Sequence, residues 1–303
     1  MTTTNNVVEI IEFTDPVCTW CWGSEPVLRK LQTRFGKQIN ISFVMAGLVK
    51  DITSFYDSHN DIGGDPARSN ANIARHWLEA SELHGMPVES KGFRLFSREH
   101  PSTYPQNIAY KAAQLQEQML ANRFLRRIRE ASAAEVKLTN TTEVLIELAS
   151  EVGLDVARFL EDITSGAAQK SFEQDLATTA QYQAHGFPTF LVRFGKKETI
   201  LRGYKRYEEF KAVMEYLSNG TITEHLVPAS EEAIMQFIRT YDSVAPIEIK
   251  MSFDLTDAAL KTAVDSLLAQ QLITRRGAGN GYFISPKISS MACASGTGIC
   301  AVT

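Results

Sequence analysis

Two cysteines in a Cys-x-x-Cys pair, Cys18 and Cys21, are the residues of this sequence best suited to chemistry. They follow an apolar run, residues 7–14, and stand at the start of a helix-type run that reaches Phe35. A thiol in the first turn of a helix lies near the positive end of the macrodipole and near unpaired N–H groups, which favour the thiolate. The thiolate attacks disulfides. The pattern therefore predicts thiol–disulfide exchange, in which Cys18 attacks and Cys21, on the same helix face, resolves the mixed disulfide.

A carboxyl group lies shortly before the cysteine pair. Glu12 stands between Ile11 and Phe13 in the apolar run, where no alternation leaves a clear solvent face. We therefore expect Glu12 to be buried under the cysteines and to exchange a proton with Cys21. A surface acid at the end of a strand is the alternative. We predict no metal, because a zinc site needs about four ligands and the six histidines form no second pair at short spacing. We predict no cofactor, because no Gly-rich phosphate loop follows a strand.

The elements that must position the cysteines form a βαβ unit. A buried strand (7–14), a helix (25–35) and a second, parallel strand (39–45) are predicted in this order. Between residues 48 and 185 the pattern is almost entirely helical, with apolar residues at i, i+3 and i+4. The predicted helices are residues 70–83, 105–119, 122–134, 142–152, 156–164 and 168–183. The polar stretch 51–65 is predicted to be a mobile loop near the site or a plain linker.

A second motif, Gly186-Phe187-Pro188-Thr189, precedes another apolar strand, residues 190–194, and its hairpin partner, residues 198–201. A Cys-x-x-Cys between strand and helix, a long helical stretch and Gly-x-Pro-Thr before a strand together resemble the DsbA-type oxidoreductases of the thioredoxin fold. The Asp-Pro-x-Cys-x-x-Cys-Trp-Gly stretch is most similar to the FrnE-like branch. The resemblance covers about residues 6–218.

This resemblance implies an α/β fold. The thioredoxin core would occupy residues 6–50 and 185–218, with residues 51–184 inserted as helices, so that a first domain spans residues 6–220. The resemblance also implies a cis bond at Pro188, although only about 5–6% of X-Pro bonds in folded proteins are cis. A cis-proline there would expose the backbone of Phe187 for pairing with an extended substrate.

The residues around the cysteines predict the character of the site. Trp20 and Trp22 are expected to form an aromatic rim that gathers extended peptide, with simple packing as the alternative. Thr19 and Trp20 bring no positive charge beside Cys18, whereas DsbA has Pro-His between its cysteines. We therefore predict a reduction potential near the reducing end of the range of about −270 to −120 mV.

Residues 226–287 are predicted to form a second, winged-helix-like unit of helices followed by a Gly-rich ribbon. Between residues 228 and 287 there are seven Asp or Glu and six Lys or Arg, so the unit is a poor candidate for DNA binding. A protein contact, dimerisation or a lid over the redox site is favoured. The tail, residues 288–303, is predicted to be irregular. Its Cys293 and Cys300 are either a second redox pair, two unrelated thiols or part of a metal site.

The whole chain has ordinary globular composition, with 303 residues, 44% hydrophobic residues and a net charge of −4. This charge gives no general attraction to nucleic acid or anionic membrane. The first residues carry no basic segment, so we expect a cytoplasmic protein, where a cysteine pair is more often catalytic than structural.

The predicted function is thiol–disulfide exchange, as an oxidoreductase or isomerase, with protein or peptide partners and a cellular dithiol reductant. Two alternatives stay open. The first is a non-catalytic adaptor, because DsbA-like proteins that deliver clients to the ClpXP protease resemble this chain at Asp-Pro-x-Cys. The second is a glutathione-dependent isomerase of the 2-hydroxychromene-2-carboxylate type, which shares the inserted fold but has a Ser at the position of Cys18.

Overall fold

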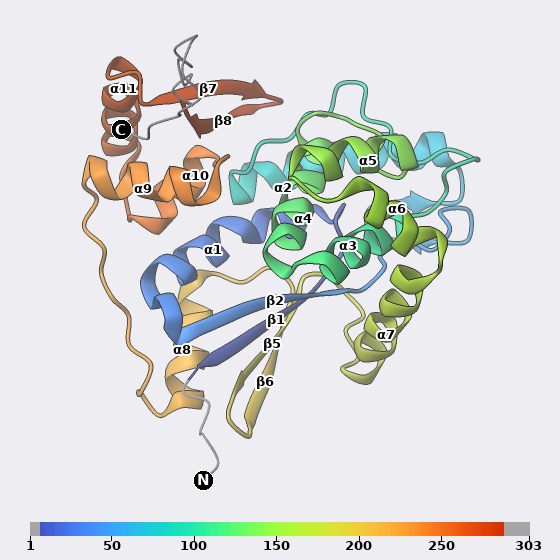
Figure 1. Cartoon of the computed structure of the whole chain (residues 1–303), viewed down its shortest axis with the longest axis horizontal. Helices are drawn as coiled ribbons and strands as arrows, with labels where there is room; N and C mark the ends of the chain where they lie inside the picture. The colour runs from blue at the N-terminus through green and yellow to red at the C-terminus, as the bar shows by residue number, and fades with distance from the viewer. Residues whose placement is uncertain (1–6, 288–303) are drawn as a thin grey trace, which may run out of the picture.

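A computed structural model describes residues 7–287 of the chain (Figure 1). Within these residues a four-stranded sheet has the strand order β2-β1-β5-β6. The strands are β1 (Val8–Thr14), β2 (Ile39–Met45), β5 (Thr189–Phe194) and β6 (Lys197–Arg202). Strand β1 pairs in parallel with β2 and antiparallel with β5, which pairs antiparallel with β6. The predicted α/β thioredoxin architecture is confirmed, because segments far apart in the sequence share one mixed sheet.

Helix α1 (Thr19–Phe35) carries the cysteine pair in its first turn. It begins at Thr19 rather than at the predicted residue 25, because Cys18 caps it and so satisfies one of the N–H groups that a helix start leaves unpaired. It ends at Gly36, whose φ of 52° suits glycine. Apolar side chains of α1 and α8 (Tyr207–Ser218) form one buried cluster with β1 and β5. This packing fixes the helix that carries the cysteine pair against the sheet.

The helical insertion is confirmed, with one addition. Its helices are α2 (Pro66–His84), α3 (Tyr104–Gln116), α4 (Gln118–Ala133), α5 (Thr142–Glu151), α6 (Val156–Thr164) and α7 (Ala167–Gln181). The stretch 51–65, predicted as a loop, contains a short hairpin of β3 (Tyr56–Asp57) and β4 (Ile62–Gly63). Strands of two residues are too short for alternation to be visible in a sequence.

The C-terminal unit has the predicted winged-helix-like order. It consists of α9 (Glu231–Tyr241), α10 (Pro246–Ser252), α11 (Asp257–Ala269) and the ribbon of β7 (Ile273–Ala278) and β8 (Gly281–Pro286). The unit has a buried core of its own, to which every one of these elements contributes. Its exact boundaries stay a prediction.

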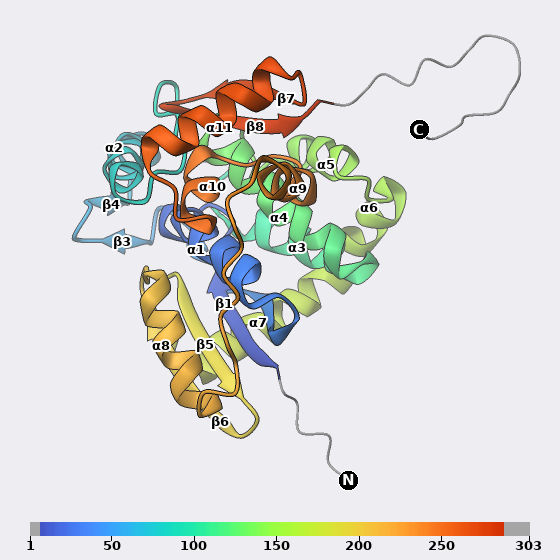
Figure 2. The same cartoon turned by 90° about the vertical axis from the view of Figure 1, so that its left-hand side faces the viewer.

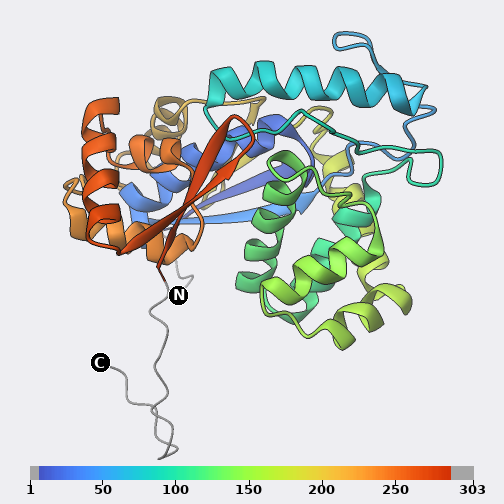
Figure 3. The ribbon, with the colours of Figure 1, turned by 90° about the horizontal axis from the view of Figure 1, so that it is seen from above.

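The C-terminal unit packs on the back of α1 instead of hanging free (Figure 2). Lys30 and Arg34 of α1 form ion pairs with Asp254, the Arg34 pair at 2.7 Å. At the other end, the tip of the β7–β8 ribbon reaches the segment after α2 (Figure 3), where Asn280 N–H donates to the Val88 carbonyl at 3.0 Å. At Gly279 a Cβ would lie 2.2 Å from this carbonyl oxygen, so only glycine fits. In the described part of the chain, no helix is long and apolar enough to span a bilayer.

Candidate functional site

Cys18 and Cys21 have the asymmetry that thiol–disulfide exchange requires. The Cys18 side chain is 7% exposed and reaches a pocket, whereas Cys21 is completely buried. Cys18 Sγ accepts a hydrogen bond from Cys21 N at 3.3 Å, and both thiols are free. Burial, together with the neighbouring Cys18 sulfur, raises the pKa of the Cys21 thiol well above its usual value. Cys21 therefore needs a proton acceptor before it can attack.

Glu12, the predicted proton acceptor, lies beside Cys21. Its side chain is completely buried, as predicted from the apolar run. Burial raises the pKa of Glu12 to about 7, although Arg129 and the nearby side chains of Thr14 and Cys21 act in the opposite direction. One carboxyl oxygen, Oε2, has no hydrogen-bond partner in the described part of the chain. A carboxyl group with a pKa near neutrality beside a buried thiol can exchange protons at physiological pH.

Arg129 links Glu12 to a buried network that sequence reasoning missed. The guanidinium of Arg129 is buried, lies 3.5 Å from Glu12 Oε1, donates to Thr14 Oγ1 at 2.7 Å and forms an ion pair with Glu25. Burial raises the pKa of Glu25, but the guanidinium groups of Arg129, Arg29 and Arg126 outweigh it and lower this pKa to about 2. Glu25 is therefore always ionised at neutral pH.

The network continues into the C-terminal unit through Arg126. This side chain contacts Glu248 of α10 at 2.8 Å and Glu130 at 2.9 Å, and its guanidinium lies 4.6 Å from the centre of the Trp22 ring. Glu248 is completely buried. A continuous set of buried charges thus connects the carboxyl group under the cysteines with the C-terminal unit.

Asp15 holds the turn that leads into Cys18. Its buried carboxylate accepts hydrogen bonds from Val17 N at 3.0 Å and Leu48 N at 2.7 Å. Thr103 Oγ1 and Asn107 Nδ2, both from the start of α3, donate to it at 2.8 Å. One side chain therefore joins the active-site turn, the end of β2 and the helical insertion, which explains an aspartate at this position.

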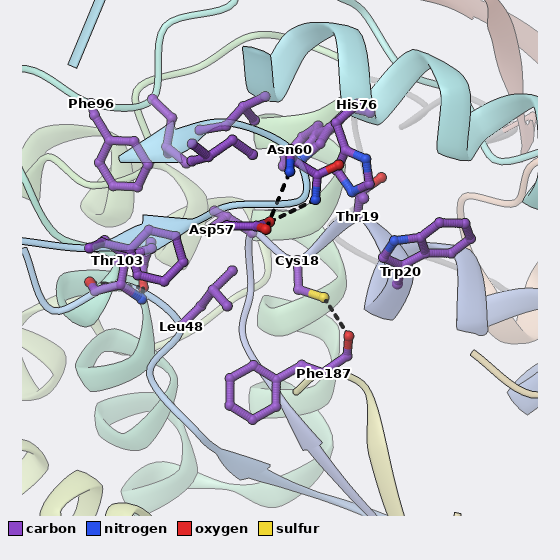
Figure 4. Close-up of a pocket in the computed structure, with 17 residues that line it drawn as sticks. Cys18, Thr19, Trp20, Leu48, Asp57, Asn60, His76, Phe96, Thr103 and Phe187 are labelled. Atoms are coloured by element: carbon purple, nitrogen blue, oxygen red, sulfur yellow. Dashed lines mark hydrogen bonds between the residues drawn. The ribbon is translucent and has the colours of Figure 1, made fainter. Parts of the chain in front are cut away.

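The Gly-x-Pro-Thr motif lies directly opposite the cysteines. The Phe187–Pro188 peptide bond is cis, as the resemblance implied. Cys18 Sγ donates a weak hydrogen bond to the Phe187 carbonyl at 3.6 Å (Figure 4). The geometry is that expected for pairing a substrate backbone beside the Cys18 sulfur, and this role of Phe187 and Pro188 stays a prediction.

The two tryptophans have different environments. Trp20 is half-buried, and its ring lies about 6 Å from the rings of His76, His84 and Tyr204. Trp22 is only 1% exposed, donates from Nε1 to a backbone carbonyl at 3.0 Å and packs on the β8 side of the ribbon. The expectation that Trp22 belongs to a substrate-gathering rim is therefore wrong for this structure, because the C-terminal unit covers it.

A pocket of about 200 Å³ opens beside Cys18 (Figure 4). Its walls come from the β3–β4 hairpin, from α2 and from the loops that carry Leu48, Phe96 and Phe187. In the described residues no cluster of His, Cys, Asp and Glu suitable for a metal is found. Cys293 and Cys300 lie outside the described residues, so their pairing stays a prediction.

Comparisons with known proteins agree with this architecture and add a functional association. A family model described as "Thioredoxin" matches residues 12–212. The chain is 31% identical to the ClpXP adapter protein SpxH of Halalkalibacterium halodurans, over 88% of this chain and 84% of that protein. It is 24% identical to the protein of the same name from Bacillus subtilis, over 91% of this chain and 88% of the relative.

Two solved structures share the fold. The cytosolic disulfide reductase DsbM from Pseudomonas aeruginosa has a TM-score of 0.53 at 20% identity, over 69% of this chain and 97% of that chain. A 2-hydroxychromene-2-carboxylate isomerase has a TM-score of 0.50 at 13% identity, over 69% and 95%. A match over 69% of this chain fits within the thioredoxin part alone. The alignment with SpxH covers 88% of this chain, which is more than residues 1–225 make up, so it extends into the C-terminal unit.

Proposed function

Because this chain belongs to the thioredoxin family, with a DsbA-like helical insertion, we propose that it acts in the cytoplasm as an adapter that binds client proteins for a protease of the ClpXP type. The observation that carries the proposal is the 31% identity to an adapter along 88% of the chain. This alignment includes part of the C-terminal unit, whereas the disulfide reductase matches a share that the thioredoxin part alone can account for. The FrnE-like branch stays a prediction.

The way the two parts are joined supports an adapter function. An adapter has to hold its client and its protease in one arrangement, and a freely jointed unit would do this poorly. Here α10 packs along α1, and the buried Arg126–Glu248 pair crosses the interface. The site beside Cys18 and the exposed faces of the C-terminal unit are therefore joined through a packed, buried interface, an arrangement that suits binding two proteins at once.

Protein half-lives in cells test the adapter function. We expect that deleting the gene lengthens the half-lives of a small set of proteins, measured by pulse-labelling and mass spectrometry, and that inactivating ClpP lengthens the same half-lives without an additive effect. The matched control is a strain complemented with the full chain, which should restore the shorter half-lives. The proposal would be contradicted if deleting the gene left all half-lives unchanged. It would also be contradicted if the deletion lengthened them by the same factor in a strain that already lacks ClpP.

Thiol–disulfide exchange is the second candidate, favoured by the arrangement of Cys18, Cys21 and Glu12. The Cys18 thiolate attacks a client disulfide, forms a mixed disulfide and releases one client thiolate. Cys21 then passes its proton to Glu12 and attacks Cys18 Sγ, which releases the second client thiol and leaves a Cys18–Cys21 disulfide. A cellular dithiol returns two electrons and completes the cycle.

A catalytic assay separates the two candidates. An exchange enzyme should accelerate the reduction of insulin by dithiothreitol, and replacing both cysteines with serine should abolish the acceleration. The adapter function alone predicts no acceleration of insulin reduction. It also predicts that the double-serine chain, expressed in the deletion strain, restores the shorter client half-lives as the original chain does. A glutathione titration tests the isomerase alternative, which requires saturable glutathione binding.

A further inference from the structure

One side of the pocket beside Cys18 is built by the stretch 51–65, whose short hairpin sequence patterns did not predict. Phe55, Asp57, Asn60 and Ile62 of the β3–β4 region form one side of it, and Ile73, His76 and Trp77 of α2 lie next to them. Figure 4 shows Asp57, Asn60 and His76 grouped above the Cys18 sulfur, with Phe187 below. The pocket thus lies between the attacking cysteine and an insertion-specific wall.

The size of the pocket limits its occupant. Sites for small-molecule ligands have volumes of about 300–1,000 Å³, whereas this pocket has about 200 Å³. Its inner wall consists of buried apolar side chains, Ile62 at 8%, Ile73 at 6% and Trp77 at 4% exposure. A pocket of this size and lining suits one large apolar side chain better than a whole cofactor.

The charged side chains that line the pocket are acidic. Among the described residues that line it there is one carboxylate, Asp57, and no Lys or Arg. Asp57 is held in place by hydrogen bonds from His59 N at 3.0 Å and from Asn60 Nδ2 at 2.7 Å. Partial burial raises the pKa of Asp57, but these hydrogen bonds outweigh it and keep this pKa below its ordinary value.

The neighbouring imidazole does not balance this charge. Burial lowers the pKa of His76, with Asp57 acting in the opposite direction, so the ring is mostly neutral at pH 7. The described residues that line the pocket therefore carry a net negative charge. An anionic ligand such as glutathione would meet it without a compensating cation among the described lining residues, while a basic group would be attracted.

We propose that this pocket binds an anchor side chain of the client: one large apolar residue, Phe or Leu, in an extended segment that carries Lys or Arg two positions away. In an extended chain residues i and i+2 face the same side, so both side chains can reach the wall formed by Asp57 and Ile73. The proposal rests on the proposed function, because it assumes that the chain binds client proteins. It adds the kind of client segment that the chain recognises.

Fluorescence anisotropy with the full chain tests the preference directly. The probes are fluorescein-labelled peptides with Phe-Gly-Lys, Phe-Gly-Glu or Ala-Gly-Lys between Gly-Ser flanks, in dithiothreitol and without cysteine. We expect the Glu peptide to bind about 2- to 5-fold more weakly than the Lys peptide, the range for a partly solvated charge contact. The Ala peptide should bind more than about tenfold more weakly, because it leaves the apolar wall empty. Molar salt should reduce the Lys-to-Glu ratio.

Two variants assign the preference to the pocket. Asp57→Asn keeps an acceptor oxygen for the hairpin and removes the charge, so it should bring the Lys-to-Glu ratio close to one. Asp61→Asn is the matched control, because Asp61 is in the same hairpin but does not line the pocket, and it should leave the ratio unchanged. Equal binding of the Lys and Glu peptides to the unmodified chain, displacement by glutathione, or the same effect of both variants would overturn the proposal.

The outcome is separable from that of the adapter function. If the peptide preference is found but cellular half-lives do not depend on the chain, the pocket proposal stands and the adapter function fails. If half-lives depend on the chain but the peptides show no preference, only the pocket proposal fails.

Discussion

The raised pKa of Glu12 makes folding stability depend on pH in an unusual direction. In the folded chain this pKa is about 7, compared with 4.5 for an ordinary glutamate. Between these values the folded state binds more protons than the unfolded state, so the free energy of unfolding falls as pH rises. The stabilisation is fully present below pH 4.5 and is lost as pH rises through about 7. Most carboxyl groups paired in a native state have the opposite effect.

The magnitude follows from the size of the shift. Each pKa unit corresponds to about 1.36 kcal/mol, so the step from 4.5 to about 7 corresponds to about 3 kcal/mol. Glu12→Gln replaces the carboxyl group with a neutral group of the same shape. The variant should therefore have nearly the same free energy of unfolding as the original chain at pH 4. At pH 8 it should be more stable by about 3 kcal/mol.

Urea unfolding at pH values from 4 to 8, with a phosphine reductant that keeps both cysteines reduced, measures this difference. The other titrating groups contribute equally to both chains, so the difference between them isolates Glu12. Glu9→Gln is the matched control, because Glu9 lies on the same strand but is about one-third exposed and near Arg193. The assignment of Glu12 as a buried proton carrier would be refuted by either of two results. The difference in the free energy of unfolding between Glu12→Gln and the original chain would not change with pH, or the original chain would be the more stable one at pH 8.

Three further predictions concern the interface and the thiols. Glu248→Ala leaves the buried Arg126 guanidinium without its closest C-terminal partner and should cost about 3 kcal/mol of stability. Asp265→Ala, in an exposed pair with Lys261, should cost less than about 1 kcal/mol in the same urea experiment, and equal costs would contradict the buried network. Cys21→Ser should trap client proteins as mixed disulfides on non-reducing gels, whereas Cys18→Ser should trap none; trapping by the second variant alone would reverse the assigned order of attack. The reduction potential of the pair, measured against glutathione buffers, should lie nearer −270 than −120 mV, and a value above about −150 mV would overturn the prediction from Thr19 and Trp20.

Much of the fold and the centre of the site could be predicted from the sequence, because the signals are local. A Cys-x-x-Cys between an apolar strand and a helix determines which thiol lies at the helix start, and Cys18 is indeed the cap. Helix Val156–Thr164 has its predicted bounds, because apolar periodicity and capping residues act within a few positions. Even the burial of Glu12 followed from the unbroken apolar run around it.

Only the tertiary structure decided what surrounds the cysteines. Arg129 and Glu248 meet the site from other elements of the chain, and no local pattern tells which buried arginine pairs with which carboxylate. The burial of Trp22 depends on Phe283 of the C-terminal unit, which lies more than 60 residues beyond the thioredoxin core. The β3–β4 wall of the pocket is made by strands of two residues. Burial and charge pairing are properties of contacts between distant segments, so their effects on pKa, exposure and recognition appear only when the chain is folded.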